Sequence, residues 1–422
     1  MNLEVALGLA VFVGTYALIA TERVHKTLAA MAGGVAMVLL GIVTQEEAFA
    51  EIDFNVIFLL AGMMILAGII RQTGLFGWLA VRSARFARAE PYRILVVLSV
   101  ITAVASALLD NVTTVVLVGP ITLFLAARLG MSPFPFIVSE ILASNIGGAA
   151  TLIGDPPNIL IGSAANLGFD AFLIHMAPLS ALLLAMYLVA ARWLFRADLH
   201  ADPEHRDGLL QLDERQMITN PGLLRSSLIV LGATLLGFLL HGPLGLEPAT
   251  IALTGAVVLM VVARQSPDEV LREVEWPTLF FFIGLFMLVA GVIEIGVIDA
   301  VAQAIMTVTG GALGPTSILL LWVSAVLSGV IDNIPYTATM IPVVEQLSAG
   351  HESNALWWSL AIGADLGGNA TIIGASANVI LAGMAEREGH RISFGSFLRY
   401  GVPVTLSTML ISTAYVWLRY LL

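Results

Sequence analysis

Long apolar runs separated by short polar segments follow one another along almost the whole chain. A membrane-spanning helix needs about 20 predominantly apolar residues, and ten runs are close to this length. They lie at residues 3–20, 28–43, 54–71, 134–163, 174–195, 226–241, 247–264, 277–293, 355–384 and 397–420. The pattern therefore predicts an all-α polytopic membrane protein.

Two further apolar runs, 94–127 and 316–348, carry an Asp-Asn pair at their centre. A charged side chain at the centre of a spanning helix is unfavourable by roughly 2.5–3.5 kcal/mol. We therefore expect each run to form a re-entrant hairpin, in which two helices enter the membrane and return to the same side. Irregular backbone at that depth is tolerated where it is buried in protein or lines a cavity, so both hairpin tips are candidate parts of a transport site.

The two halves of the chain match each other in three separate blocks. The matching pairs are 53–74 with 275–296, LLDNVTTVVLVGPI (108–121) with VIDNIPYTATMIPV (330–343), and NIGGAATLIGDPPN (145–158) with DLGGNATIIGASAN (365–378). Each half holds five spans and one hairpin, and an odd number of crossings inverts the second copy. Paired interruptions in two inverted repeats mark the binding site of many transporters near the bilayer midplane.

These features predict the organisation of the chain and its orientation. The parts are a first repeat (1–195, hairpin 94–127, broken helix 134–163), a cytoplasmic linker loop (196–225) and a second repeat (226–422, hairpin 316–348, broken helix 355–384). With both termini extracytoplasmic, 18 of the 19 Lys and Arg residues face the cytoplasm, as the positive-inside rule requires. We expect a multi-pass protein of the cell (inner) membrane.

Composition agrees with a membrane protein and excludes several functions. The chain is 58% hydrophobic and 12% charged, whereas soluble domains carry about 25% charged residues. A net charge of −11, with basic residues confined to span ends, excludes a nucleic-acid partner. Cysteine is absent, and with it thiolate metal sites; we predict no metal site and no cofactor. No protease, zinc-hydrolase or ATPase motif is present, so a transporter is expected and not an enzyme.

The tip of each predicted hairpin combines an Asp-Asn pair with threonines. Asp and Asn are common helix caps, and one interpretation is that they cap the second arm. Capping alone does not require a carboxylate at membrane depth, so we favour a role in binding or coupling. The tip residues are Asp110, Asn111, Thr113 and Thr114 in the first half, and Asp332, Asn333 and Thr337 in the second.

The fourth span of each half is interrupted by Gly and, in the first half, by a Pro pair, which an unbroken helix does not accommodate. Capping of a half-helix is an equally good interpretation of Asp155. The candidate substrate-binding residues are Asn111, Thr113, Thr114, Asn145, Gly148, Thr151, Asn158, Asn333, Thr337, Gly368, Thr371 and Asn378. The candidate proton-coupling residues are Asp110, Asp332, Asp155 and Asp365, because acids at helix breaks can exchange a proton as the site opens to each side in turn.

Charge narrows the choice of substrate. The sequence places no Lys or Arg within the membrane core beside these four acids, and Glu140 is expected to be an acid at the membrane interface. A dianion would then depend on helix N-termini and bound cations. A neutral hydroxide such as arsenous acid, or a small cation, fits this arrangement better.

At the quoted blocks the sequence resembles the ion transporter superfamily, in particular the arsenite/antimonite permease and NhaD-type antiporter group. The motifs are most similar to the branch that contains the melanosomal P protein. This resemblance implies scaffold and transport domains, elevator-type alternating access and a homodimer, and it leaves room for a separate ATPase subunit. We therefore expect arsenite/antimonite–proton antiport first, sodium–proton antiport second and organic-anion symport third.

Overall fold

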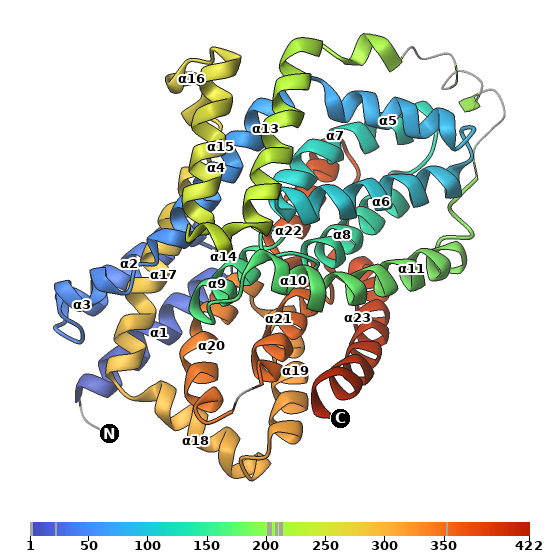
Figure 1. Cartoon of the computed structure of the whole chain (residues 1–422). Coiled ribbons are helices and arrows are strands. Elements are labelled where there is room, and N and C mark those ends of the chain that lie inside the picture. The colour runs from blue at the N-terminus through green and yellow to red at the C-terminus, as the bar shows by residue number, and fades with distance from the viewer. Residues whose placement is uncertain (1–2, 22, 201–204, 207–209, 211–213, 352) are drawn as a thin grey trace.

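The computed structural model describes residues 3–21, 23–200, 205–206, 210, 214–351 and 353–422, and this part of the chain is helical without strands (Figure 1). The first half contains α1 (Leu3–Thr21), α2 (Lys26–Leu39), α3 (Gln45–Ala50), α4 (Phe54–Arg71), α5 (Leu75–Phe86), α6 (Pro91–Leu108), α7 (Asn111–Arg128), α8 (Phe134–Gly148), α9 (Pro156–Ala164), α10 (Phe169–His175) and α11 (Ala177–Leu194). A short turn, η1 (Glu214–Met217), precedes the second half. That half contains α13 (Pro221–Leu239), α14 (His241–Leu244), α15 (Pro248–Ala263), α16 (Pro267–Leu271), α17 (Trp276–Glu294), α18 (Val297–Thr309), α19 (Leu313–Val330), α20 (Asn333–Ser348), α21 (Ala355–Gly367), η2 (Ile372–Gly374), α22 (Ser376–Arg387), α23 (Phe394–Val416) and η3 (Trp417–Leu421).

The predicted membrane protein is confirmed by the length and surface of its helices. Within the described residues, nine helices are long and apolar enough to cross a membrane, and α9 with α10, bent by 115°, would add a tenth. Large apolar side chains such as Val261 (71% exposed) and Leu410 (64%) lie on the outer surface. A soluble protein rarely exposes apolar surface on this scale, whereas lipid covers it in a membrane.

The inverted repeat appears in the packing as a set of mirrored helix pairs. Helix α2 of the first half packs on α17 of the second, and their equivalents α15 and α4 pack on each other. Small residues allow both close approaches. A Cβ atom added to Gly284 would lie 2.5 Å from the backbone N of Met31, and one added to Gly62 would lie 2.8 Å from the carbonyl C of Ala252. Each half therefore completes its packing with the other half.

The two Asp-Asn pairs lie where a helix pair turns back on itself. Helices α6 and α7 pack together and are joined by a turn at Leu109 and Asp110; α19 and α20 are joined in the same way at Ile331 and Asp332. Both Asp residues accept a hydrogen bond from a backbone N–H of the following helix and so cap it. The first tip is buried, and at the second tip Asn333 is buried while Ile331 and Asp332 are half-buried.

Each hairpin is fastened to the broken helix of its own half by equivalent contacts. The Ser106 hydroxyl donates to the Ser144 carbonyl at 2.8 Å, and the Ser328 hydroxyl donates to the Ala364 carbonyl at 2.5 Å. Gly147 and Gly367 permit this approach, because a Cβ atom at either would lie within 2.4 Å of backbone atoms of the hairpin. A hairpin and its broken helix therefore form one packed unit.

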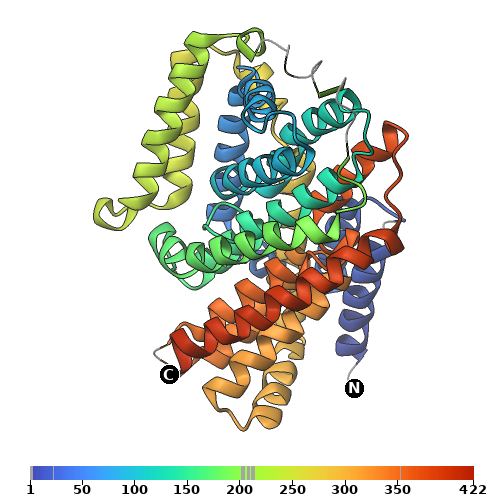
Figure 2. The same ribbon diagram turned by 90° about the vertical axis from the view of Figure 1, so that its right-hand side faces the viewer.

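The boundary between the halves differs from the prediction. Helix α13 begins at Pro221, inside the predicted linker 196–225, because Asn220 caps it and Pro221 suits the first helical position. Part of that linker lies outside the described residues. The N- and C-terminal ends lie on one side of the molecule, opposite α16 (Figures 1 and 2).

Candidate functional site

A cavity of about 450 Å³ lies at the hairpin tips, between α2 and α17 on one side and α9 and α22 on the other. Its polar lining consists of His25, Lys26, Thr27, Asp110, Glu275, Thr278, Asp332 and Ser376. Apolar side chains, among them Leu60, Met64 and Ile380, form most of the remaining wall. The cavity therefore offers a few charged and hydrogen-bonding groups in an otherwise dry surrounding, which is typical of a small-molecule site.

Six helices begin at this cavity: α2, α7, α9, α17, α20 and α22. A helix N-terminus carries about half a positive elementary charge, because its first N–H groups lack partners within the helix. Together, six such ends offset the carboxylates of Asp110, Glu275 and Asp332 that line the cavity. The Lys26 ammonium adds one further positive charge, so the cavity is not the purely acidic site that the sequence suggested.

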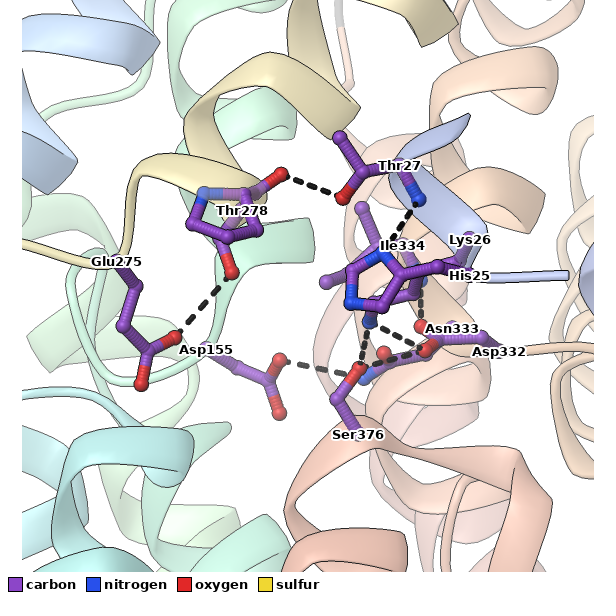
Figure 3. Close-up of polar contacts among 11 residues, drawn as sticks. His25, Lys26, Thr27, Asp155, Glu275, Thr278, Asp332, Asn333, Ile334 and Ser376 are labelled. Carbon is purple, nitrogen blue, oxygen red and sulfur yellow. Dashed lines mark hydrogen bonds and ion pairs between the residues drawn. The ribbon is translucent and has the colours of Figure 1, made fainter. Parts of the chain in front are cut away.

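Lys26 overturns the prediction that no basic residue lies at the site. Its ammonium donates to Asp332 Oδ2 at 3.3 Å and to Ser376 Oγ at 2.5 Å (Figure 3). It also lies 5.1 Å from the centre of the Phe281 ring. The prediction was wrong because residues 21–27 were treated as a loop outside the membrane core. Lys26 instead begins α2 at the cavity, and its side chain reaches the second hairpin tip.

Asp155 is the point where the two hairpins meet. The amide of Asn111, on the first hairpin, donates to Asp155 Oδ2 at 2.6 Å. The amide of Asn333, on the second hairpin, donates to Asp155 Oδ1 at 3.2 Å (Figure 3). Asn111 and Asn333 thus approach each other, and the carboxylate between them comes from the first broken helix.

Two equivalent asparagines hold the breaks of α8–α9 and α21–α22 in shape. The Asn158 amide donates to the carbonyls of Gly148 and Thr151, and the Asn378 amide donates to those of Gly368 and Thr371. These carbonyls belong to backbone that has left the helix and would otherwise be buried without partners. Asn158 and Asn378 therefore have a structural task, whatever else they bind.

The five predicted threonines lie close to the hairpin tips and the helix breaks. The hydroxyls of Thr151 and Thr371 donate to the Ala107 and Gly329 carbonyls and so fasten the breaks to the hairpins. Thr337 donates to the Asn333 carbonyl, and Thr113 donates its backbone N–H to Asp110. The Thr114 hydroxyl is buried and has no hydrogen-bond partner among the described residues. None of these five threonines is among the described residues that line the cavity.

Two predicted polar residues, Asn145 and Asp365, lie where α8 of the first repeat contacts α21 of the second. We call this contact the crossing of the two repeats. Asn145 donates its amide to Asn378 Oδ1 at 2.9 Å and to Asn369 Oδ1 at 3.0 Å. Asp365 is fully buried, and its carboxyl group faces the side chain of Asn158. Both residues thus belong to a polar layer that lies behind the cavity.

Glu140 is buried within the protein, whereas the sequence suggested an acid exposed at the membrane interface. Its side chain is 1% exposed and is hydrogen-bonded to the Thr122 hydroxyl of α7. The expectation rested on the position of Glu140 along the span and did not consider which face of the helix it lies on. The face of α8 that carries Glu140 packs against α7.

The sequence analysis missed six polar residues at the cavity: His25, Lys26, Thr27, Glu275, Thr278 and Ser376. One signal was available for Lys26, which is the only lysine in the sequence, beside 18 arginines. An ammonium is a compact point charge on a flexible stem, which suits a contact that forms across an interface. In the part of the chain that the structure describes, no three His, Asp or Glu side chains are grouped so as to hold a metal ion.

Comparison with a family model gives one match over most of the chain. The model is described as citrate transporter (CitMHS), and it matches residues 16–363.

Several curated proteins are similar over their full length or a large part of it. An uncharacterized transporter of Mycobacterium tuberculosis is 44% identical over 98% of both chains. The 46 kDa membrane protein of Mycobacterium leprae is 43% identical, over 98% of this chain and 99% of its own. The human P protein is 34% identical over 98% of this chain and 59% of its own length. The similarity to the P protein branch is thus confirmed, while the narrower arsenite permease and NhaD-type grouping stays a prediction.

A solved structure has the same fold. The crystal structure of the Alcanivorax borkumensis YdaH transporter, described as having an unusual topology, superposes with a TM-score of 0.61 over 99% of this chain and 98% of its own. The two sequences are 16% identical, so this likeness concerns the fold alone.

Proposed function

This chain belongs to the citrate transporter family of membrane proteins, and from that membership we propose that it is a proton-coupled secondary transporter of a small organic anion. Carboxylates are the first class of substrate to test. The cavity at the hairpin tips is the proposed substrate site. Protons supply the drive, through the buried acids at the helix breaks.

The observation that carries this proposal is the convergence of Lys26 and six helix N-termini on one cavity. N-termini of half-helices bind the anionic groups of substrates in transporters with inverted repeats. Ser376, Thr27 and Thr278 would add hydrogen bonds to a carboxylate. An anion that took the place of Asp332 beside Lys26 would exchange one charge-assisted hydrogen bond for another.

Arsenite or antimonite efflux by proton antiport becomes the second candidate. It ranked first on the premise that no basic residue lies at the site, and Lys26 removes that premise. One observation still favours it: the side-chain oxygens of Asn111 and Asn333 are buried and have no partner within the described residues. A neutral trihydroxide could donate hydrogen bonds to both. Sodium–proton antiport follows as the third candidate.

We place the movement between two packed bodies. Helices α1–α4, α13 and α15–α17 would form the scaffold, and the hairpins, the broken helices, α11 and α23 would form the transport domain. The cavity lies at their junction, and the ion pair between Lys26 and Asp332 crosses it. An elevator-type movement of the transport domain would therefore break this ion pair in each cycle.

Flux measurements on purified protein in proteoliposomes test the proposal. Labelled citrate, arsenite and sodium would be offered separately under an imposed pH gradient, with protein-free liposomes as the control. We expect accumulation of a di- or tricarboxylate together with proton movement. Uptake of arsenite without any carboxylate would transfer the function to the second candidate, and sodium flux alone would transfer it to the third.

A further inference from the structure

Three buried oxygen atoms on two neighbouring side chains, one from each repeat, have no hydrogen-bond donor. They are both carboxyl oxygens of Asp365 and the amide oxygen of Asn158, and none has a hydrogen-bond partner among the residues that the structure describes. Both side chains are 0% exposed. Buried acceptors that oppose one another without a hydrogen between them are strongly unfavourable.

The orientation of the Asn158 amide is fixed by its other contacts. Its NH₂ group donates to the carbonyls of Thr151 at 3.1 Å and Gly148 at 3.4 Å. A flipped amide would direct its oxygen at these two carbonyls, so the observed assignment is the one the network requires. The amide oxygen of Asn158 must then point toward Asp365 as an acceptor.

In the equivalent contact of the other repeat, the asparagine oxygen has a hydrogen-bond donor. Asn378 is the equivalent of Asn158, and its amide is held by the equivalent carbonyls of Gly368 and Thr371. Its oxygen accepts a hydrogen bond of 2.9 Å from the Asn145 amide, and Asn145 is the equivalent of Asp365. Where one repeat has an amide donor, the other repeat has a carboxyl group, which donates only when it carries a proton.

The other three acids at the breaks already act as acceptors. Asp155 accepts from the amides of Asn111 and Asn333. Asp332 accepts from Lys26 and Ser376, and Asp110 accepts from the Thr113 N–H. An ionised carboxylate satisfies all of these contacts.

We infer that Asp365 carries the coupling proton, held between its carboxyl group and the amide oxygen of Asn158, while Asp110, Asp155 and Asp332 remain acceptors. The inference rests on the proposed proton-coupled transport and narrows it from four acids to one. The proton leaves Asp365 as H⁺ when the site opens to one side, and the carboxylate takes up another H⁺ from the opposite side. One proton then moves in each cycle.

The charges around Asp365 agree with this role. The acidic and basic side chains on the elements packed against α21 are Asp155 before α9, Glu140 on α8, Asp332 before α20, Glu345 on α20 and Arg399 on α23. Asp155 is the one whose charge interacts with Asp365. Because two neighbouring negative charges repel each other, one of the two carboxyl groups keeps a proton. The amides of Asn111 and Asn333, which both donate to Asp155, assign that proton to Asp365.

Infrared spectroscopy of the purified full-length protein tests the assignment without any transport assay. The carbonyl stretch of protonated carboxyl groups should be weaker in Asp365→Asn than in the wild type and unchanged in the matched variants Asp110→Asn and Asp332→Asn. Any part of the band that comes from buried Glu140 is common to all four proteins. Asn145 already shows that an amide is accommodated at the equivalent position, so Asp365→Asn should fold. Persistence of the full band in Asp365→Asn would overturn the inference.

The reciprocal substitution provides a second and independent measurement. Asn145→Asp places a carboxyl group opposite the amide oxygen of Asn378, so a second protonated band should appear. Failure of that band to appear in folded protein would show that this amide oxygen does not hold a proton, and would also overturn the inference.

Transport assays then separate the inference from the proposed function. With the membrane potential clamped at zero, a pH difference of about one unit drives roughly tenfold accumulation by a carrier that moves one proton. Asp365→Asn should lose this accumulation yet keep substrate exchange at equal pH, while Asp268→Asn on exposed α16 should behave as the wild type. If the wild type moves no carboxylate but the infrared bands follow the expectation, the proposed substrate is wrong and the role of Asp365 stands. Undiminished accumulation in Asp365→Asn would refute that role.

Discussion

Lys26 links two parts of the molecule through a single side chain. It begins α2, and its ammonium is paired with Asp332 at the tip of the second hairpin. The equivalent position in the second repeat is Pro248, and within the described residues an ion pair is present at the second hairpin tip and not at the first. The site is therefore asymmetric in charge although the backbone around it is repeated.

Replacing Lys26 by Gln should weaken the binding of an anionic substrate. The substitution removes one charge-assisted hydrogen bond, which contributes about 1.5–3 kcal/mol, and the KM should rise roughly tenfold or more. Initial uptake rates against substrate concentration in proteoliposomes give this value. Arg23→Gln is the matched control, because Arg23 is a neighbouring base with an exposed side chain; an equal rise of the KM in both variants would contradict a specific role for Lys26.

At the same scale, the sequence indicated which acids gather at the site but not what each one does. The Asp-Asn pairs and the glycine-broken spans could be recognised, because a charge or a helix break within an apolar run is unfavourable unless it is used. The partners could not be recognised, because Lys26 and Asp332 are 306 positions apart and meet through the packing of α17 against both α2 and α20. The different roles of Asp155 and Asp365 likewise depend on hydrogen-bond directions that the sequence does not contain.

Among the elements, the crossings of α2 with α17 and of α4 with α15 depend on small residues at the contact. Gly284→Ala would place a Cβ atom 2.5 Å from the backbone N of Met31, and backbone cannot move aside as a flexible side chain can. We expect destabilisation by about 1–3 kcal/mol, observed as a lower Tm of the detergent-solubilised protein. Gly232→Ala in α13 is the control, since the added Cβ would have nothing within 4 Å; equal Tm values for the two variants would contradict this packing argument.

Most elements could be predicted from the apolar pattern, and the exceptions have physical reasons. Helix α18 was not predicted, because its apolar and polar positions alternate around the helix and leave no continuous apolar run. The start of α13 was placed too late, because Arg225 was given more weight than the capping signal of Asn220 and Pro221. Periodicity identifies a helix from its buried face and says less about its ends.

For the whole molecule, the proposed movement can be tested by joining α1 of the scaffold to α20 of the transport domain. The Tyr16 hydroxyl donates to the Pro335 carbonyl at 2.6 Å and also contacts the Thr339 hydroxyl. A Tyr16→Cys/Thr339→Cys pair, cross-linked by mercury ions in this cysteine-free chain, should stop transport, and a reducing thiol should restore it.

The matched control joins two helices within the transport domain. Trp322 of α19 donates to the Thr413 hydroxyl of α23 at 3.0 Å. A Trp322→Cys/Thr413→Cys pair should tolerate the cross-link, because these helices would move together. Full transport by the cross-linked Tyr16→Cys/Thr339→Cys protein would exclude relative movement at that junction.

The orientation in the membrane is a second property of the whole molecule. The distribution of basic residues predicts extracytoplasmic termini and a cytoplasmic linker. In intact cells, an impermeant thiol reagent should label Leu422→Cys, which is 86% exposed, and should not label Asp198→Cys until the cells are opened. The reverse pattern would invert the proposed orientation.

The mirrored packing of α2 on α17 and of α4 on α15 also has a consequence for synthesis of the protein. When the first half leaves the ribosome, the faces of α2 and α4 that receive these partners are still uncovered, and lipid alone surrounds them. Until the second half is made, the first half therefore remains in the bilayer with these faces unpacked. Membrane proteases or insertion chaperones can bind it during this time. Two separately expressed halves should accordingly be short-lived when alone and persist when made together.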